Sequence, residues 1–285
     1  MQFHSKPAVW VGEVKLRVED LERSLAFYKN ILGFEVLRKT ENSAELTADG
    51  LTRLISLVQP AEIVPKTGRR AGLYHFAVLL PNRSDLARLV THFLVKGIRF
   101  AASDHLVSEA LYLEDPDGNG IEIYSDRDPA TWRWYGDIVA MDTIPLNLDD
   151  LMKEPEAAQP WQGVPKDTIV GHIHLHVSHL KEAEKFYTDG LGFDIVSRMG
   201  DSALFMSTNR YHHHIAVNVW NGVGAPPTPP NMVGLEHFTI VLPDEDKLEE
   251  VKLNLQAIDA SFHESQGEIN TTDPAGNRIK LVIRH

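Results

Sequence analysis

Three side chains that could bind a metal or transfer a proton surround one tight turn. The segment DHLVSEALYLEDPDGNGIEIY, residues 104–124, carries His105, Tyr112 and Glu122 around Asp-Pro-Asp-Gly-Asn. A related turn near the C-terminus, in TDPAGNRIKLVI, has Lys280 at the position that corresponds to Glu122. A protonated lysine has no lone pair and would repel a divalent cation. Only the first copy of the turn therefore offers a metal ligand.

Histidines supply further candidates, because the chain has 14 of them and no cysteine. Any metal must therefore be held by nitrogen and oxygen. His172, His174 and His176 alternate with apolar residues, so they project from one face of a strand. Three imidazoles make a poor core, because their nitrogens need partners; a solvated outer face is the other reading. His75 alone would be read as a buried, hydrogen-bonded histidine, and only its pairing with Glu122 makes it a ligand candidate.

The run His212-His213-His214 offers an acid-base group. If the run is a strand, His212 and His214 face the side opposite His213 and are dispensable. A turn decorated with polar side chains is the alternative, and the sequence does not fix which of the three points inward.

Internal repeats define the elements that must position these residues. VGEVKLRVEDLERSLAFYKNILGFEV, from Val11, matches VGHIHLHVSHLKEAEKFYTDGLGFDI, from Val170, without a gap. GLYHFAVLLPN, from Gly72, likewise matches GLEHFTIVLPD, from Gly234. We call the four units modules 1, 2, 3 and 4 in chain order. Each predicts a strand, a helix and three short strands, so the fold class is α+β with four tandem βαβββ modules.

The modules group into two predicted domains. Asp20 is a predicted N-cap and Gly33 a predicted C-terminal stop for the first helix. Residues 126–168 form a long connection containing proline and aspartate and the short helical pattern LDDLMKEP. The first domain is therefore expected at 9–125 and the second at 169–285, with 126–168 as linker.

Composition narrows the class of function. Apolar content of 43% and charged content of 24% are typical of a globular protein. The formal charge of −12 would repel a nucleic acid. No apolar run approaches the length of a membrane span, and the first residues lack the apolar region of a signal peptide. These features predict a cytoplasmic protein that binds neither nucleic acid nor membrane; whether it forms a homo-oligomer is left open.

At this point the chain resembles the vicinal oxygen chelate superfamily over nearly its whole length. The block VEDLERSLAFYKNILGF marks only the superfamily. The blocks DHLVSEALYLEDPDGNGIEIY and NRYHHHIAV are similar to segments of the two-domain extradiol ring-cleaving dioxygenases of the catechol 2,3-dioxygenase type. The resemblance implies two domains of the glyoxalase/bleomycin-resistance/extradiol dioxygenase type.

The resemblance also implies a ligand set. Members of the family place a histidine on the first strand of each of two facing modules and a glutamate on the last strand of one. Modules 3 and 4 would offer His172 and His237 but Lys280 in place of the glutamate, and modules 1 and 2 would offer one imidazole. Modules 2 and 3 supply a complete set, and we therefore predict that they face each other with the ligands His75, Glu122 and His172.

The activity implied is cleavage of a small aromatic diol by O2 at a non-haem Fe(II), with Mn(II) as the alternative metal. By the same resemblance, His213 is the acid-base residue, Tyr112 donates to a substrate oxygen and His105 supports the charge of the bound diol. Two other activities share the fold: cleavage of a hydroquinone, and a glyoxalase-type isomerase or lyase with a fourth protein ligand such as Glu13. A non-enzymatic module would need the concave pocket without the ligand set.

Overall fold

The computed structural model describes residues 2–265 and 267–283. Each module has the predicted βαβββ order, and in modules 1 and 3 a π-helical turn extends the helix. The elements of the first half are β1 (Trp10–Arg17), α1 (Leu21–Phe27), the turn Tyr28–Leu32, β2 (Glu35–Lys39), β3 (Ser43–Thr47), β4 (Ile55–Val58), β5 (Gly72–Leu79), α2 (Arg83–Lys96), β6 (Ala101–Asp104), β7 (Ser108–Glu114) and β8 (Gly120–Asp126).

The second half repeats this order after a structured connection. The connection contains the 3-10 turn Pro129–Thr131, β9 (Trp134–Tyr135), β10 (Ile138–Val139), β11 (Ile144–Pro145) and α3 (Leu148–Leu151). The elements that follow are β12 (Ile169–His176), α4 (Leu180–Lys185), the turn Phe186–Gly190, β13 (Asp194–Met199), β14 (Ala203–Ser207), β15 (Ile215–Asn218), β16 (Gly234–Leu242), α5 (Glu245–Ala257), β17 (Phe262–Ser265), β18 (Glu268–Thr272) and β19 (Arg278–Ile283).

The helix ends follow the local signals in the sequence. The carboxylate of Asp20 accepts a hydrogen bond from the backbone N–H of Arg23, so Asp20 is the N-cap of α1. Gly33 ends the following π-helical turn with φ of 91°, a left-handed conformation that favours glycine. Both predictions for the first helix are confirmed.

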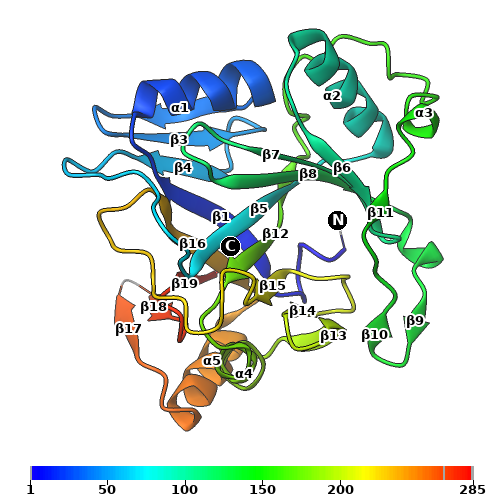
Figure 1. Cartoon of the computed structure of the whole chain (residues 1–285). Coiled ribbons are helices and arrows are strands. Elements are labelled where there is room, and N and C mark those ends of the chain that lie inside the picture. Colours follow the sequence, from blue (N-terminus) through cyan, green and yellow to red (C-terminus); the bar gives the residue numbers. More distant parts are fainter. Residues whose placement is uncertain (1, 266, 284–285) are drawn as a thin grey trace.

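The strands form two large sheets that join modules from different halves of the chain (Figure 1). Nine strands have the order β11-β6-β7-β8-β5-β12-β15-β14-β13, and eight have the order β17-β18-β19-β16-β1-β4-β3-β2. Module 2 therefore shares a sheet with module 3 through the antiparallel pair β5 and β12. Module 1 shares the other sheet with module 4 through β1 and β16. The predicted pairing of modules 2 and 3 is confirmed.

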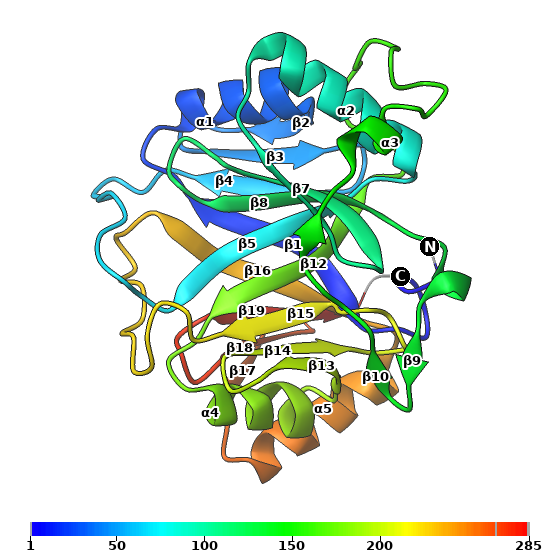
Figure 2. The ribbon, with the colours of Figure 1, turned by 45° about the vertical axis from the view of Figure 1, so that its right-hand side comes forward.

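The apolar faces of the two sheets meet in the middle of the molecule, where β1 lies against β12. Val14 and Leu16 of β1 and Ile173 and Leu175 of β12 are fully buried there. Figure 2 shows α1 and α2 at one end of the molecule and α4 and α5 at the other. The polar residues that alternate with the buried ones consequently point to the opposite face of each sheet.

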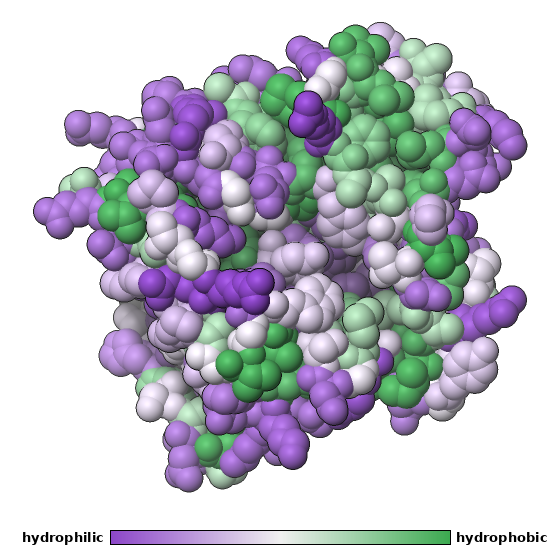
Figure 3. Space-filling model, viewed as in Figure 1, coloured by the Kyte–Doolittle hydropathy of each residue, from purple (hydrophilic) through white to green (hydrophobic). Residues whose placement is uncertain are grey.

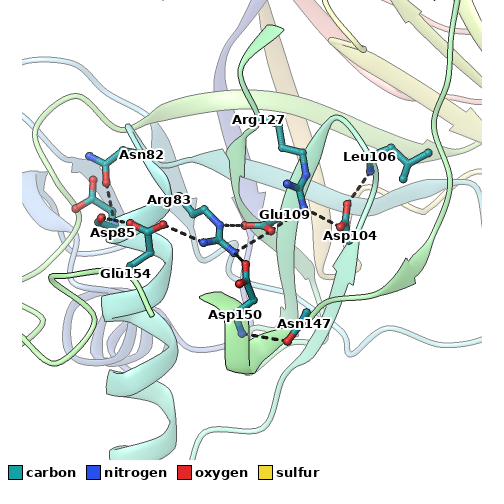
Figure 4. Close-up of polar contacts among 11 residues, drawn as sticks. Asn82, Arg83, Asp85, Asp104, Leu106, Glu109, Arg127, Asn147, Asp150 and Glu154 are labelled. Atoms are coloured by element: carbon teal, nitrogen blue, oxygen red, sulfur yellow. Dashed lines mark hydrogen bonds and ion pairs between the residues drawn. The ribbon is translucent and has the colours of Figure 1, made fainter. Parts of the chain in front are cut away.

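The connection between the halves is fastened to module 2 by two arginines (Figure 4). Arg83 at the start of α2 contacts Glu109 of β7 at 2.6 Å, Asp150 of α3 at 3.0 Å and Glu154 at 2.9 Å. Arg127 reaches the same buried Glu109 at 2.7 Å. The connection itself carries three short strands and a helix. The division into two domains at residues 125 and 169 stays a prediction.

The surface carries scattered apolar residues. Figure 3 shows polar residues over α1 and a gathering of apolar ones over α2. On α2, Leu94 is 62% exposed and Val95 is 82% exposed, and single exposed side chains of this kind are common on folded proteins. Within the described residues, no helix has the length and apolar character that crossing a membrane requires.

Candidate metal centre and its cavity

Strand register brings the three predicted ligands to one face of the nine-stranded sheet. Ala77 of β5 lies opposite Glu122 of β8 and opposite His172 of β12. His75 lies two residues before Ala77 on the same strand, so its side chain points to the same face. The methyl group of Ala77 leaves room between the larger side chains.

The ligand atoms of these three residues converge. Oε2 of Glu122 lies 3.0 Å from Nε2 of His75 and 3.1 Å from Nε2 of His172. All three ligand atoms lie within 4.8 Å of one another, and all three residues are buried. In residues 2–265 and 267–283 it is the one group of at least three histidine or acidic side chains with this geometry.

Electrostatics favours the metal-binding forms of these groups. Burial raises the pKa of Glu122, but His172 and His75 outweigh it and hold that pKa well below its usual range. Burial lowers the pKa of His172 to about 4, against the raising effect of Glu122. At neutral pH the site is thus a carboxylate beside a neutral imidazole with a lone pair. Two imidazole nitrogens and one carboxylate oxygen are the donor set of non-haem Fe(II) oxygenases, so the residues fit that metal.

The histidine run lies in a loop, so of the two alternatives the turn is confirmed and the strand is wrong. Residues 208–214 connect β14 to β15, which begins only after the run. Asn209 and Arg210 have φ of 54° and 58°, and this left-handed backbone breaks the alternation of a strand.

His212 and His214, which a strand would place on the side opposite His213, are both buried and hydrogen-bonded. His212 is fully buried, and its Nε2 lies 2.8 Å from Oδ1 of Asp126. His214 is also fully buried, and its Nε2 lies 2.8 Å from the carbonyl oxygen of Phe3. The prediction that both are dispensable is therefore withdrawn, because each has a buried polar partner to lose.

His213 points into the cavity beside the ligands. Its ring centroid is 4.1 Å from that of His172, and its Nδ1 lies 2.9 Å from Nδ1 of His212. Burial lowers the pKa of His213 well below its usual range, so the imidazole is neutral at pH 7. It can accept a proton from a group bound at the ligands.

Tyr112 and His105 form a hydrogen-bonded pair on the same side. Tyr112 of β7 lies directly opposite Glu122 of β8. Nε2 of His105 is 2.6 Å from the Tyr112 hydroxyl, and its Nδ1 is 2.8 Å from the carbonyl oxygen of Asp142. If Nδ1–H donates to that carbonyl, Nε2 accepts from the hydroxyl. Burial and the charge of Glu122 raise the pKa of Tyr112 well above its usual range, so it stays a hydroxyl.

A cavity of about 650 Å³ opens beside these groups. Five of the six predicted site residues line it, and the sixth, His172, lies behind them in contact with His213. The rest of the wall comes from six strands, two loops and the connection: Tyr74, Ala101, Ser103, Val107, Ser108, Met141, Asp142, Thr143, His174, Ser197, Arg198, Met199, Phe205 and Trp220.

Sequence reasoning missed several residues of this wall. Met141 and Asp142 belong to the connection, whose path the repeat pattern does not predict. His174 was signalled by its alternation with His172 but not assigned; its Nε2 lies 2.9 Å from Nδ2 of Asn218. Trp220 follows the last strand of module 3 and had no signal for a role.

Comparisons with known proteins agree with this architecture. The chain matches the family model described as Glyoxalase/Bleomycin resistance protein/Dioxygenase superfamily over residues 10–123 and 169–281. It is 47% identical to a catechol-2,3-dioxygenase of Bacillus subtilis (strain 168), over 96% of this chain and 97% of that protein. It is 25% identical to a metapyrocatechase of Geobacillus stearothermophilus, over 95% of this chain and 79% of that protein.

Solved structures with low sequence identity share the fold. A putative dioxygenase from Bacillus subtilis subsp. subtilis str. 168 superposes with a TM-score of 0.66 at 11% identity, covering 98% of this chain and 86% of that one. Glyoxalase I from Zea mays superposes with a TM-score of 0.58 at 16% identity, covering 96% and 92%. Because the family model matches both halves, the chain belongs to the Glyoxalase/Bleomycin resistance protein/Dioxygenase superfamily.

Proposed function

We propose that the protein is an extradiol dioxygenase that opens the ring of a catechol-type diol with O2 at a non-haem Fe(II). The observation that carries this proposal is the convergence of His75, Glu122 and His172 beside a cavity that also receives His213 and Tyr112. The identity of 47% to a protein named catechol-2,3-dioxygenase, over nearly the full length of both chains, supports it.

His75, Glu122 and His172 would hold the metal. A bound Fe(II) supplies electron transfer between an aromatic diol and O2, which the redox-inactive zinc and magnesium cannot do. Mn(II) prefers similar ligands and is the second choice.

The other residues of the cavity would bind the diol and move its protons. His213, neutral at pH 7, accepts a proton from a diol hydroxyl at its imidazole and returns it later in the reaction. The Tyr112 hydroxyl, which lies 2.6 Å from Nε2 of His105, can turn its proton away from His105 to donate to a diol oxygen. Met141, Phe205 and Trp220 provide an apolar wall that limits the access of water to the ring.

A glyoxalase-type reaction is less well supported, because Glu13 does not lie at the centre as a fourth ligand. Glu13 lies on β1 in the other sheet. It accepts a hydrogen bond of 2.6 Å from Ser56 and pairs with Arg53 at 2.8 Å.

Oxygen uptake by the Fe(II)-loaded protein tests the proposal. Catechol should consume O2 and give the yellow ring-opened semialdehyde, and hydroquinone serves as the parallel substrate that separates the two ring-cleaving activities. Conversion of a 2-oxoaldehyde in the presence of a thiol, without oxygen uptake on any diol, would replace the dioxygenase by an isomerase.

A further inference from the structure

A β-bulge turns Tyr74 toward the cavity. In the pairing of β5 with β12, His75 lies opposite His174 and Leu73 lies opposite Leu175, so Tyr74 is left without a partner. A bulge of this kind re-aims a side chain that regular alternation would send to the other face. The Tyr74 ring accordingly lies beside its neighbour, with its centroid 4.8 Å from that of His75.

The neighbouring strand is shaped to accept the bulge. A Cβ atom at Gly120 of β8 would lie 2.1 Å from the carbonyl oxygen of Tyr74 and 3.1 Å from Cβ of His75. Both distances are shorter than a normal contact, so only glycine lets the backbone of Tyr74 approach this closely.

Tyr74 stands between two cavities. The cavity at the candidate metal centre and a second one of about 750 Å³ share the residues Tyr74, His75 and Tyr112. The Tyr74 ring lies 5.0 Å from the ring of His174 and 5.3 Å from that of Trp220, which line only the first cavity. It also lies 5.1 Å from the ring of His176, which lines only the second.

Packing, and not a hydrogen bond, holds this ring. The Tyr74 hydroxyl makes no hydrogen bond to any residue in 2–265 or 267–283, and the side chain is 40% exposed. The ring is therefore positioned by its aromatic neighbours. The volume that it occupies sets how far the first cavity extends toward the second.

We propose that Tyr74 is a specificity-determining residue that closes the substrate cavity and thereby selects small, single-ring diols over diols that carry a second aromatic ring. The proposal rests on the proposed dioxygenase function. A second ring on the substrate needs the space that Tyr74 fills, whereas a single ring packs against Tyr74. Removing the side chain joins the two cavities and removes the selection.

Kinetics with two substrates tests this role. In Tyr74→Ala, kcat/KM for an aryl-substituted catechol relative to catechol should rise by roughly tenfold or more, the range that pocket shape alone supplies, mainly through KM. Tyr74→Phe, which keeps the ring, should keep the wild-type ratio. Tyr135→Ala removes a tyrosine that is 70% exposed and lies outside the cavity, and controls for the loss of an aromatic ring. Tyr74→Leu provides a smaller truncation if the alanine variant does not fold.

A binding measurement that needs no turnover tests the role of Tyr74 independently of the proposed dioxygenase activity. The affinities of phenol and 2-phenylphenol for the metal-loaded protein are measured by calorimetry, because neither is a diol. Tyr74→Ala should tighten 2-phenylphenol relative to phenol by a similar factor. An unchanged ratio in both assays, or an equal change in Tyr74→Phe, overturns the role of the ring. If the wild type cleaves no diol, the dioxygenase proposal fails while the binding ratio still decides the role of Tyr74.

Discussion

Two imidazoles and one carboxylate from three strands make up the candidate metal centre, so metal binding there should be sensitive to the loss of each side chain. His75→Ala, Glu122→Ala and His172→Ala should each lose about one iron per chain, because two remaining donors bind a divalent ion weakly. Metal analysis after anaerobic loading and desalting measures the loss. His237→Ala is the matched control, since His237 is the module 4 counterpart of His75 and lies in the other sheet. If the His75 variant retained iron and the His237 variant lost it, the metal site would have to be assigned to the sheet that contains His237.

His213 should contribute to rate and not to metal affinity. His213→Ala should keep its iron and lose about a hundredfold in kcat, the usual range for a positioned proton-transfer group. His212→Ala should lose less, because it removes only the contact to Nδ1 of His213 and the bond to Asp126. Stopped-flow turnover with catechol measures both, and iron analysis on the same samples shows whether metal was lost. A His213 variant with normal turnover would exclude the acid-base role.

Residue types and the family resemblance predicted six site residues, and the structure brings them together at one cavity; their roles stay a prediction. The residues that depend on the path of the chain were not predicted. His75, Glu122 and His172 were predicted as ligands because only modules 2 and 3 supply a complete donor set. Tyr74 was missed because adjacent residues on a regular strand face opposite sides, and a bulge is not visible in the hydrophobic pattern.

At the scale of elements, the order of strands and helices in each module could be predicted, since alternation and helical spacing are local properties. The loop 208–214 could not, because its conformation depends on buried contacts to Asp126 and Phe3, which are far away in sequence. The attachment of β11 to β6 likewise depends on where the connection crosses the sheet.

The arginine cluster at the start of α2 should stabilise the connection measurably. Arg83→Ala removes three carboxylate contacts, and Glu109, which is 3% exposed, keeps only Arg127. We expect a loss of about 1–3 kcal/mol in the free energy of unfolding, the range for hydrogen bonds to charged groups, reduced by the 30% exposure of the Arg83 side chain. The midpoint of urea unfolding measures it. Lys153→Ala, which breaks the exposed pair with Asp150, should change the midpoint very little.

At the scale of the whole molecule, buried histidines should make the protein acid-sensitive. Burial lowers the pKa of His4 from 6.5 to about 4 and lowers those of His174 and His214 well below the usual range. As the pH falls below 6.5, the unfolded chain therefore takes up protons that the folded chain refuses. Each such group costs up to about 1.4 kcal/mol of stability per pH unit, down to its folded pKa.

Thermal unfolding of the metal-free protein between pH 7.5 and pH 4.5 measures this loss. The midpoint should fall steadily below about pH 6.5. In His4→Gln the amide can still donate to the carbonyl of Gly171. This variant should show a smaller decrease of the midpoint, because its unfolding takes up about one proton fewer. His263→Gln, at an exposed position, should leave it unchanged. A midpoint that stays level to pH 4.5 would contradict the burial of neutral imidazoles.

The exchange of partners between the two halves bears on how the protein is made. While the first half emerges from the ribosome, β1 and β5 can each pair along one edge, with β4 and β8. Their other edges wait for β16 and β12, which are synthesised much later. A nascent chain of this kind carries two open strand edges, the feature on which chains aggregate, throughout translation of the connection, and the edge of β1 stays open through module 3 as well. Production in the cell should therefore depend on chaperones that cover these edges until β12 and β16 have been made.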